Sequence, residues 1–176
     1  MFEWQDKAKQ DAAQQTDKPS SLRDLLNPTP IPIIICGKTE QVGSGVIEGL
    51  KPEFEVIHFV QSPDSGAAII PAILSGKTPP SHPDSSSIGT GNYTVPPRAV
   101  VLGSLFDEAG FTTIKNAVLA DPAAKNILWL RNDTSKPGPP IGPGYPESVI
   151  ARVREAMARL EKEGKLDGEY AGEEWY

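Results

Sequence analysis

The stretch that decides the fold is IPIIICGKTEQVGSG, residues 31–45. Its first six residues are apolar and mostly isoleucine, and the run is too short for a typical helix. Such β-branched runs are typical of strands buried on both faces, which belong to parallel sheets. Gly37 follows the run directly, and the apolar spacing of residues 42–50 then predicts a helix. The stretch therefore predicts a buried strand, a glycine turn and a helix.

The alternation of strand and helix continues through the rest of the chain. Further strands are predicted at 54–60, 99–103 and 126–130, and further helices at 65–75, 106–119 and from Pro146 to Leu160. Repeated strand-then-helix order implies an α/β fold, a small doubly wound Rossmann-like domain of about four parallel strands with helices on both faces. We predict three regions. They are a polar N-terminal arm (1–30), the α/β domain (31–165) and an acidic aromatic tail (166–176).

Two long connections bear on where a ligand binds. Ligands of parallel sheets lie at the carboxyl ends of the strands. Residues 131–145 follow a strand, so we expect them to cover that edge. Residues 76–97 are rich in Pro, Ser and Gly and follow a helix, so we expect a long flexible loop that starts at the opposite edge.

Composition excludes several classes of partner. The chain has 176 residues, a formal net charge of -6 and a pI near 5.0, without the basic stripe that nucleic-acid binding requires. No apolar segment approaches the roughly 20 residues that cross a bilayer. The single cysteine, Cys36, has no disulfide partner within the chain, and the N-terminus does not resemble a signal peptide. We therefore expect a cytoplasmic protein that binds neither nucleic acid nor membrane.

The turn after the first strand has the spacing of a nucleotide-binding motif. Gly37 and Gly43 are six residues apart, Thr39 lies between them, and an apolar helix follows. Over about residues 31–61 this resembles the NmrA-like, atypical short-chain dehydrogenase group, whose turn reads G-x-x-G-x-x-G. The resemblance implies an NAD(P)-binding Rossmann fold, with NAD(P) as the cofactor.

The predicted ligand-contacting residues lie in this turn and at the ends of the other strands. They are Gly37, Lys38, Thr39, Glu40, Gln41, Val42, Gly43, Gln61, Ser62, Ser104 and Arg131. The sequence identifies no catalytic residue. It also predicts no metal site, because His58 and His82 lack ligand spacing and His58 falls inside a predicted strand. Cys36 is interpreted as a small buried residue.

The motif departs from the family at three points. Glu40 takes the place of the middle glycine, where backbone approaches phosphate and where a carboxylate adds bulk and repulsion. Gln61 and Ser62 replace the acidic residue that binds ribose in NAD-binding forms, and the Tyr-x-x-x-Lys pair of catalytic members is absent. The leading hypothesis is a small Rossmann-like protein that binds a nucleotide-type or other small anionic ligand at this turn, without being an autonomous dehydrogenase.

Two other hypotheses remain open at this stage. Aromatic residues gather at both ends of the chain and are enriched in interfaces, so a non-catalytic interaction or assembly module is the second hypothesis. These aromatic residues are Phe2, Trp4, Tyr170, Trp175 and Tyr176. The partner is a further copy of the chain or another protein, bound through the termini. The third hypothesis is a cofactor-independent isomerase or lyase that uses polar residues at the strand ends.

Overall fold

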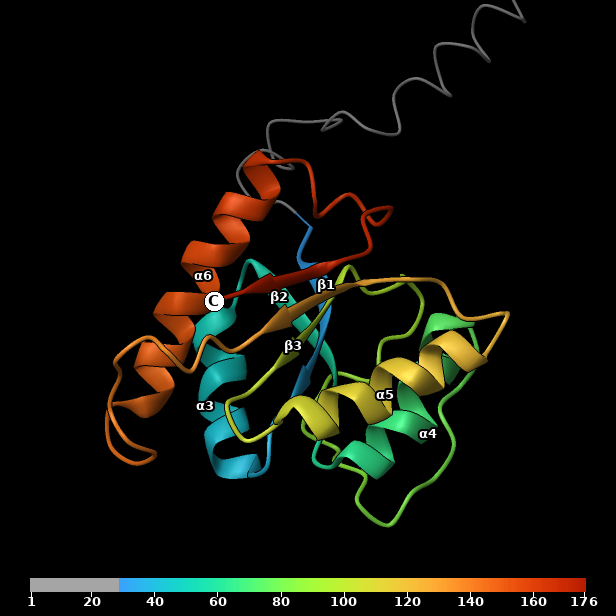
Figure 1. Cartoon of the computed structure of the whole chain (residues 1–176), viewed down its shortest axis with the longest axis horizontal. Helices are drawn as coiled ribbons and strands as arrows, with labels where there is room; N and C mark the ends of the chain where they lie inside the picture. Colours follow the sequence, from blue (N-terminus) through green and yellow to red (C-terminus); the bar gives the residue numbers. More distant parts are fainter. Residues whose placement is uncertain (1–28) are drawn as a thin grey trace, which may run out of the picture. The chain divides into compact units, whose positions relative to one another are not determined.

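Five parallel strands form one sheet in the order β2-β1-β3-β4-β5 (Figure 1). The strands are β1 (Ile31–Cys36), β2 (Phe54–Val60), β3 (Ala99–Leu102), β4 (Leu128–Arg131) and β5 (Glu173–Trp175). This computed structural model describes residues 29–176, so the expected N-terminal arm lies almost entirely outside the described residues. The predicted parallel α/β fold is confirmed, with one strand more than the four expected.

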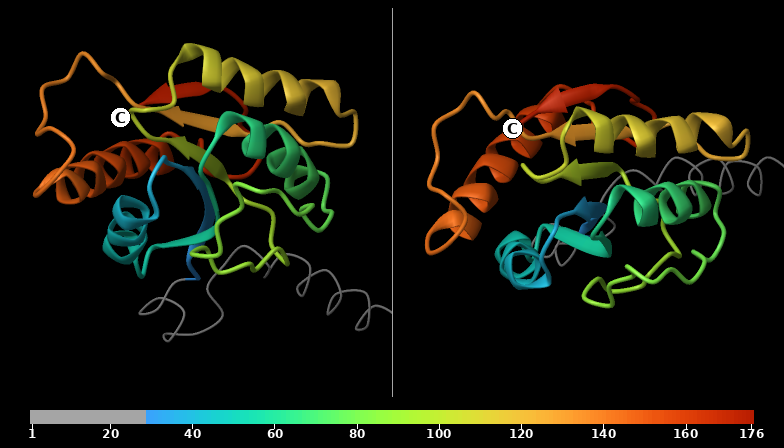
Figure 2. Two further views of the ribbon diagram at one scale, coloured as in Figure 1. Left: turned by 90° about the horizontal axis from the view of Figure 1, so that it is seen from below. Right: turned by 60° about the horizontal axis from the view of Figure 1, so that its bottom comes forward.

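Four helices connect the strands and cover both faces of the sheet. They are α3 (Glu40–Leu50), α4 (Pro63–Leu74), α5 (Glu108–Ala120) and α6 (Tyr145–Lys162). Helix α3 packs beside α6, and α4 packs beside α5 (Figure 2). None of the helices in residues 29–176 is both long and apolar enough to cross a membrane.

Alternate residues of the strands enter two separate cores. In β1, Ile33 and Ile35 join the cluster under α3 and α6, while Ile34 and Cys36 join the cluster under α4 and α5. All four side chains are buried. The continuous apolar run that predicted a strand buried on both faces is explained by this two-sided packing.

The strand order reverses at the boundary between β1 and β3. Helix α3 leaves β1 for one face of the sheet, and α5 leaves β3 for the other face. The two loops therefore diverge at the carboxyl ends of these strands and leave a crevice between them, which is where open α/β sheets bind ligands.

Helix α4 begins earlier than predicted and contains a proline. Ser62 is its N-cap, Pro63 occupies the first turn, and Pro71 lies inside the helix. The Ser62 hydroxyl accepts a hydrogen bond from the Ser65 amide at 3.1 Å. A capping serine followed by proline favours a helix start at this point, and the tertiary packing of α4 on α5 outweighs the hydrogen bond lost at Pro71.

The long connection after α4 covers the free edge of β2. It starts at the edge opposite the strand ends, as predicted, and then runs beside β2. Its amides donate from Thr90 to the Val56 carbonyl and from Gly91 to the Ile57 carbonyl, both at 2.9 Å. Ser86, which precedes these residues in the connection, donates a hydrogen bond from its hydroxyl to Glu40 in the first turn of α3. Element order alone could not predict this return, and the expected flexibility of the segment stays a prediction.

The C-terminal residues belong to the sheet. Residues 173–175 form β5 beside β4, and the Tyr176 amide donates to the Arg131 carbonyl at 3.0 Å. The Tyr176 side chain is 1% exposed. This pairing forms the fifth strand. The sequence did not predict it, because its three residues are charged or aromatic and show no strand pattern.

Candidate functional site

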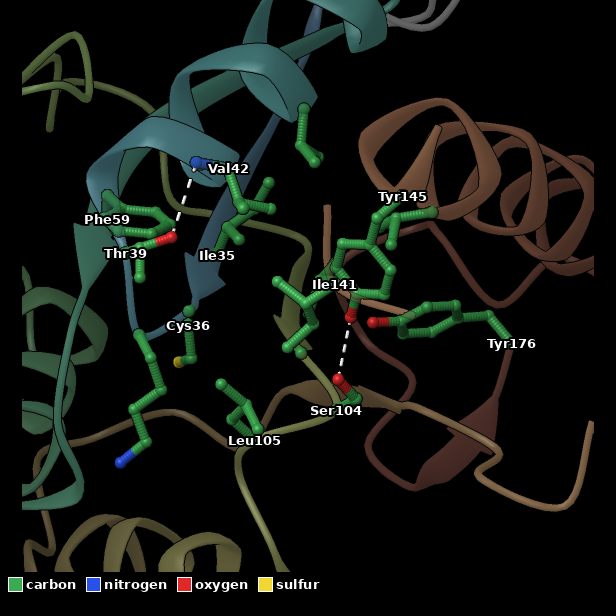
Figure 3. A pocket seen from close by; sticks show the side chains of 17 residues that line it. Ile35, Cys36, Thr39, Val42, Phe59, Ser104, Leu105, Ile141, Tyr145 and Tyr176 are labelled. Carbon is green, nitrogen blue, oxygen red and sulfur yellow. Dashed lines mark hydrogen bonds between the residues drawn. The ribbon is translucent and has the colours of Figure 1, made fainter. Parts of the chain in front are cut away.

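A pocket opens at the carboxyl ends of β1 and β3, at the point where the strand order reverses (Figure 3). Its volume is about 70 Å³. The walls come from β1, the turn into α3, the end of β3, the start of α6 and Tyr176. The pocket therefore occupies the place that the strand order predicts for a ligand.

Most of the wall is apolar. Its apolar lining includes Ile35, Val42 and Val46 of α3, Phe59 and Val149 of α6. Two larger side chains, Leu105 and Ile141, line the mouth and are 51% and 52% exposed. Exposed aliphatic side chains at the rim of an apolar pocket favour an apolar ligand, because a ligand would remove them from water.

Hydroxyl groups form the polar side of the pocket. The Ser104 and Tyr145 hydroxyl oxygens lie 2.7 Å apart and share a hydrogen bond (Figure 3). The Tyr176 hydroxyl donates to the Leu102 carbonyl at 2.8 Å. Burial raises the pKa of Tyr176 to about 12. Tyr176 is therefore a fixed neutral wall, whereas Ser104 and Tyr145 retain lone pairs that a ligand can use.

The start of α3 brings a positive charge to the pocket. Thr39 is the N-cap, and its hydroxyl accepts from the Val42 amide at 3.4 Å. Lys38 precedes it, with Nζ lying 5.0 Å from the centroid of the Phe106 ring. Among residues 29–176 no carboxylate pairs with this ammonium group. Both the helix terminus and Lys38 favour a ligand atom that carries negative charge.

The two glycines of the motif make room for an aromatic ring. A Cβ at Gly43 would lie 2.5 Å from Cζ of Phe59, and a Cβ at Gly37 would lie 3.0 Å from the same atom. Phe59 is 1% exposed and fixed between β2 and α3. In a dinucleotide-binding turn the first and third glycines serve the tight turn and the close packing of helix on strand, and the middle position is the one that approaches the pyrophosphate. The contact with Phe59 therefore accounts for Gly37 and Gly43 by packing.

Glu40 points away from the pocket. Its carboxylate accepts a hydrogen bond from the Ser86 hydroxyl at 2.7 Å and does not line the cavity. The side chain meets neither Lys38 nor Arg131. The repulsion expected from a carboxylate at this position therefore acts outside the pocket, and Glu40 instead connects α3 to the segment that covers β2.

The predicted site residues divide into two groups. Those that line the pocket are Gly37, Lys38, Thr39, Val42, Gly43 and Ser104. Those that do not line it are Glu40, Gln41, Gln61, Ser62 and Arg131. Ser62 caps α4 and donates to Asp84 at 2.9 Å. The ligand contacts predicted for all of these residues remain predictions.

Eleven wall residues were not predicted from the sequence, among them Ile141, Tyr145 and Tyr176. Ile141 belongs to the connection after β4, which was expected to cover this edge, and Tyr145 begins α6 directly before Pro146, so a proline at a helix start was the available signal. Tyr176 had no such signal, because its position depends on β5.

The buried cysteine and histidine have structural surroundings. Burial raises the pKa of the Cys36 thiol, which favours the unreactive protonated form. Burial also lowers the pKa of His58, and its Nδ1 lies 2.7 Å from the Tyr93 hydroxyl. His58 is 8% exposed, so its interpretation as a core residue is confirmed. Within residues 29–176 no three His, Cys, Asp or Glu side chains gather as a metal site would require.

A second, more polar crevice lies beyond Ser104. It has a volume of about 450 Å³ and is formed by residues after β3, residues after β4 and Trp175 of β5. Arg131 lies in its wall, paired with Glu108 and, at 2.9 Å, with Glu173. Ser104 lines both the pocket and this crevice, so the two cavities are neighbours.

Comparison with known proteins finds one clear similarity. The chain is 33% identical over 144 residues to a protein of Aspergillus oryzae (strain ATCC 42149 / RIB 40) described as "Kojic acid related protein 6". The match covers 80% of this chain and 84% of the relative. No family model matches the chain. No solved structure matches it either.

Proposed function

This chain belongs to the family of Kojic acid related protein 6, and on that premise we propose that it binds a small ring compound with oxygen substituents in the pocket between β1 and β3. The observation that carries the proposal is an apolar pocket at the reversal of strand order, with two hydroxyls on one wall. Small-molecule sites are typically of this kind, apolar with a few placed polar groups.

The size of the pocket favours a single ring. An apolar cavity of ~150 Å³ holds benzene, and the pocket here is about half that volume. A ring would therefore enter only in part, with Leu105 and Ile141 covering the portion at the mouth. A dinucleotide is several times larger than this pocket of about 70 Å³. NAD(P) is thus the less favoured ligand of the same site.

The polar groups favour oxygen atoms on the ring. Ser104 and Tyr145 each donate one hydrogen bond and accept others, so the pair suits a hydroxyl or a carbonyl. Lys38 at the mouth stabilises an oxygen that carries negative charge, as an acidic enol or phenol does. The relative's name connects that protein with kojic acid, a small hydroxypyranone with these features, which makes kojic acid a suitable probe.

Calorimetry tests the proposal with three probes, kojic acid, phenol and NADPH. We expect kojic acid and phenol to bind with dissociation constants near the millimolar range, about −4 kcal/mol, and NADPH to bind more weakly. Tyr145→Phe should weaken kojic acid several-fold because one hydrogen bond is lost. The matched control is Tyr170→Phe, which removes a hydroxyl bonded to Glu174 outside the pocket.

Two results would count against this function. One is the absence of heat from both kojic acid and phenol with the unaltered protein at several millimolar. The other is an equal loss of affinity in Tyr145→Phe and Tyr170→Phe. NADPH binding tighter than both ring compounds would instead support the dinucleotide hypothesis.

A second candidate function is that of an assembly module. Trp175 lies on the edge strand β5 and is 45% exposed, and exposed tryptophan is typical of interfaces. Tyr176 is buried in its own domain, so Trp175 is the aromatic residue at this end that is most available to a partner. Light scattering at about 100 μM protein, on the order of typical assay concentrations, tests this function. A dimer that Trp175→Lys converts to a monomer would support it, and a monomeric unaltered protein would oppose it.

A further inference from the structure

We propose that the polar crevice beside the pocket binds a neutral, hydroxyl-rich group joined to the ring, so that the ligand is a glycoside-like conjugate. This inference rests on the function proposed above, because it extends the same ligand past Ser104. The two cavities share that residue, and Lys38 of the pocket lies over Phe106 of the crevice. A substituent on the ring oxygen would pass Ser104 and enter the crevice.

The crevice has the chemistry of a site for hydroxyl groups. Its wall combines an amide, a hydroxyl, carboxylates and a guanidinium with an aromatic ring. These are Asn132, Ser135, Asp107, Asp133, Arg131 and Trp175. Hydroxyls both donate and accept, so they suit a wall that mixes donors with acceptors. The half-exposed ring of Trp175 offers an apolar face to the C–H groups of a sugar.

Charge in the crevice disfavours an anionic group. Arg131 is already paired with Glu108 and Glu173, and Asp133 adds a further negative charge. The Asp133 carboxylate accepts from the Ser135 amide at 3.1 Å and the Ser135 hydroxyl at 2.6 Å, bonds that lower its pKa and keep it ionised. An incoming anion would meet these carboxylates, and the residues that line the crevice include no unpaired cation, since Lys38, unpaired within residues 29–176, lines the pocket instead.

Charge in the crevice also gives a cation little to gain. The Asp107 carboxylate caps α5 by accepting from the Gly110 amide at 2.8 Å, and Glu108 is held by Arg131. An ammonium group would have to compete with each of these partners. A neutral hydroxyl needs only the lone pairs that these carboxylates still have, together with the N–H groups of Asn132.

The volumes of the two cavities fit this division. The pocket of about 70 Å³ receives part of a ring, whereas the crevice of about 450 Å³ is several times larger and more polar. A single sugar unit is compatible with the larger space. The conjugate should therefore bind more tightly than either of its parts.

Three neutral probes separate the two contributions. Phenol tests the pocket, methyl β-glucoside tests the crevice, and phenyl β-glucoside joins the two groups. By calorimetry with the full chain, phenyl β-glucoside should bind at least ten-fold more tightly than phenol. Methyl β-glucoside should bind more weakly than the conjugate.

Variants locate the gain. Asn132→Ala and Trp175→Ala should each reduce the affinity for phenyl β-glucoside at least three-fold and leave that for phenol unchanged. Leu119→Ala, an exposed change on α5 outside both cavities, is the control and should alter neither. Thermal unfolding of each variant confirms that it is folded.

The failures of the two proposals differ in this experiment. Equal affinities for phenol and phenyl β-glucoside would overturn the conjugate and leave the ring site standing. A ten-fold gain that both crevice variants retain would also overturn it, because the sugar would then lie elsewhere. Failure of phenol and phenyl β-glucoside alike to bind would overturn both proposals.

Discussion

Gly43→Ala is the change that most directly tests why the motif contains glycine. Gly43 lies inside α3, where replacing glycine by alanine ordinarily stabilises a helix by about 1 kcal/mol. Here the added Cβ would lie 2.5 Å from Phe59 Cζ and 3.2 Å from Ile88 Cδ1. Overpacking of this kind costs about 1–3 kcal/mol, and the buried Phe59 ring has little room to move. We expect a net loss of up to about 2 kcal/mol after the gain in helix propensity.

Gly45→Ala is the matched control on the same helix. Gly45 is exposed, and its added Cβ would meet only Pro146 at an ordinary 3.5 Å. This variant should be more stable than the unaltered protein by about 0.5–1 kcal/mol. The two alanine variants should therefore differ by about 2 kcal/mol in urea unfolding monitored by circular dichroism.

A double variant identifies the contact responsible. Phe59→Leu removes the ring atoms that the new Cβ would meet, so Gly43→Ala should cost at least 1 kcal/mol less in that background, on the order of couplings between touching residues. Equal stabilisation by Gly43→Ala and Gly45→Ala would refute the packing explanation.

Three further predictions concern single side chains. Tyr145→Phe removes the bond to Ser104 and should lower the free energy of unfolding by about 0.5–1.5 kcal/mol; no change in the urea midpoint would contradict it. Burial raises the pKa of Tyr176 from 10.0 to about 12, so its neutral form is favoured in the folded state. The contribution of this group to the free energy of unfolding is complete below pH 10 and decreases by up to about 2.7 kcal/mol as the pH rises toward 12. In Tyr176→Phe this decrease with pH should be absent. Cys36 is buried with a raised pKa, so Ellman's reagent should label it only on unfolding, and rapid labelling of native protein would contradict its burial.

The sequence predicted the parts of the fold that depend on local patterns. The apolar run of β1 requires burial on both faces, and the apolar stripe of α6 requires one buried side. Strand β5 was missed because three residues of mixed polarity carry no such pattern, and its pairing with β4 forms across some 40 residues of chain. The return of the connection along β2 was missed for the same reason, since its contacts are between distant residues.

The place of the pocket could be predicted from the sequence, and its apolar wall could not. The pocket opens beside the glycine turn after the first strand, because the strand order reverses there. Phosphate contact at these glycines stays a prediction, and in the structure both glycines pack against Phe59 from the next strand. A motif records which positions must lack a side chain. The neighbour that imposes this requirement is visible only in the packed structure.

Electron density for a bound ring tests the central claim most directly. A crystal of the protein soaked in phenol should show the ring between Val42 and Val149, with its oxygen within hydrogen-bond distance of Ser104 or Tyr145. Density for phenol only at other surfaces, or a pocket that stays empty at several millimolar phenol while the crystal diffracts well, would contradict the account.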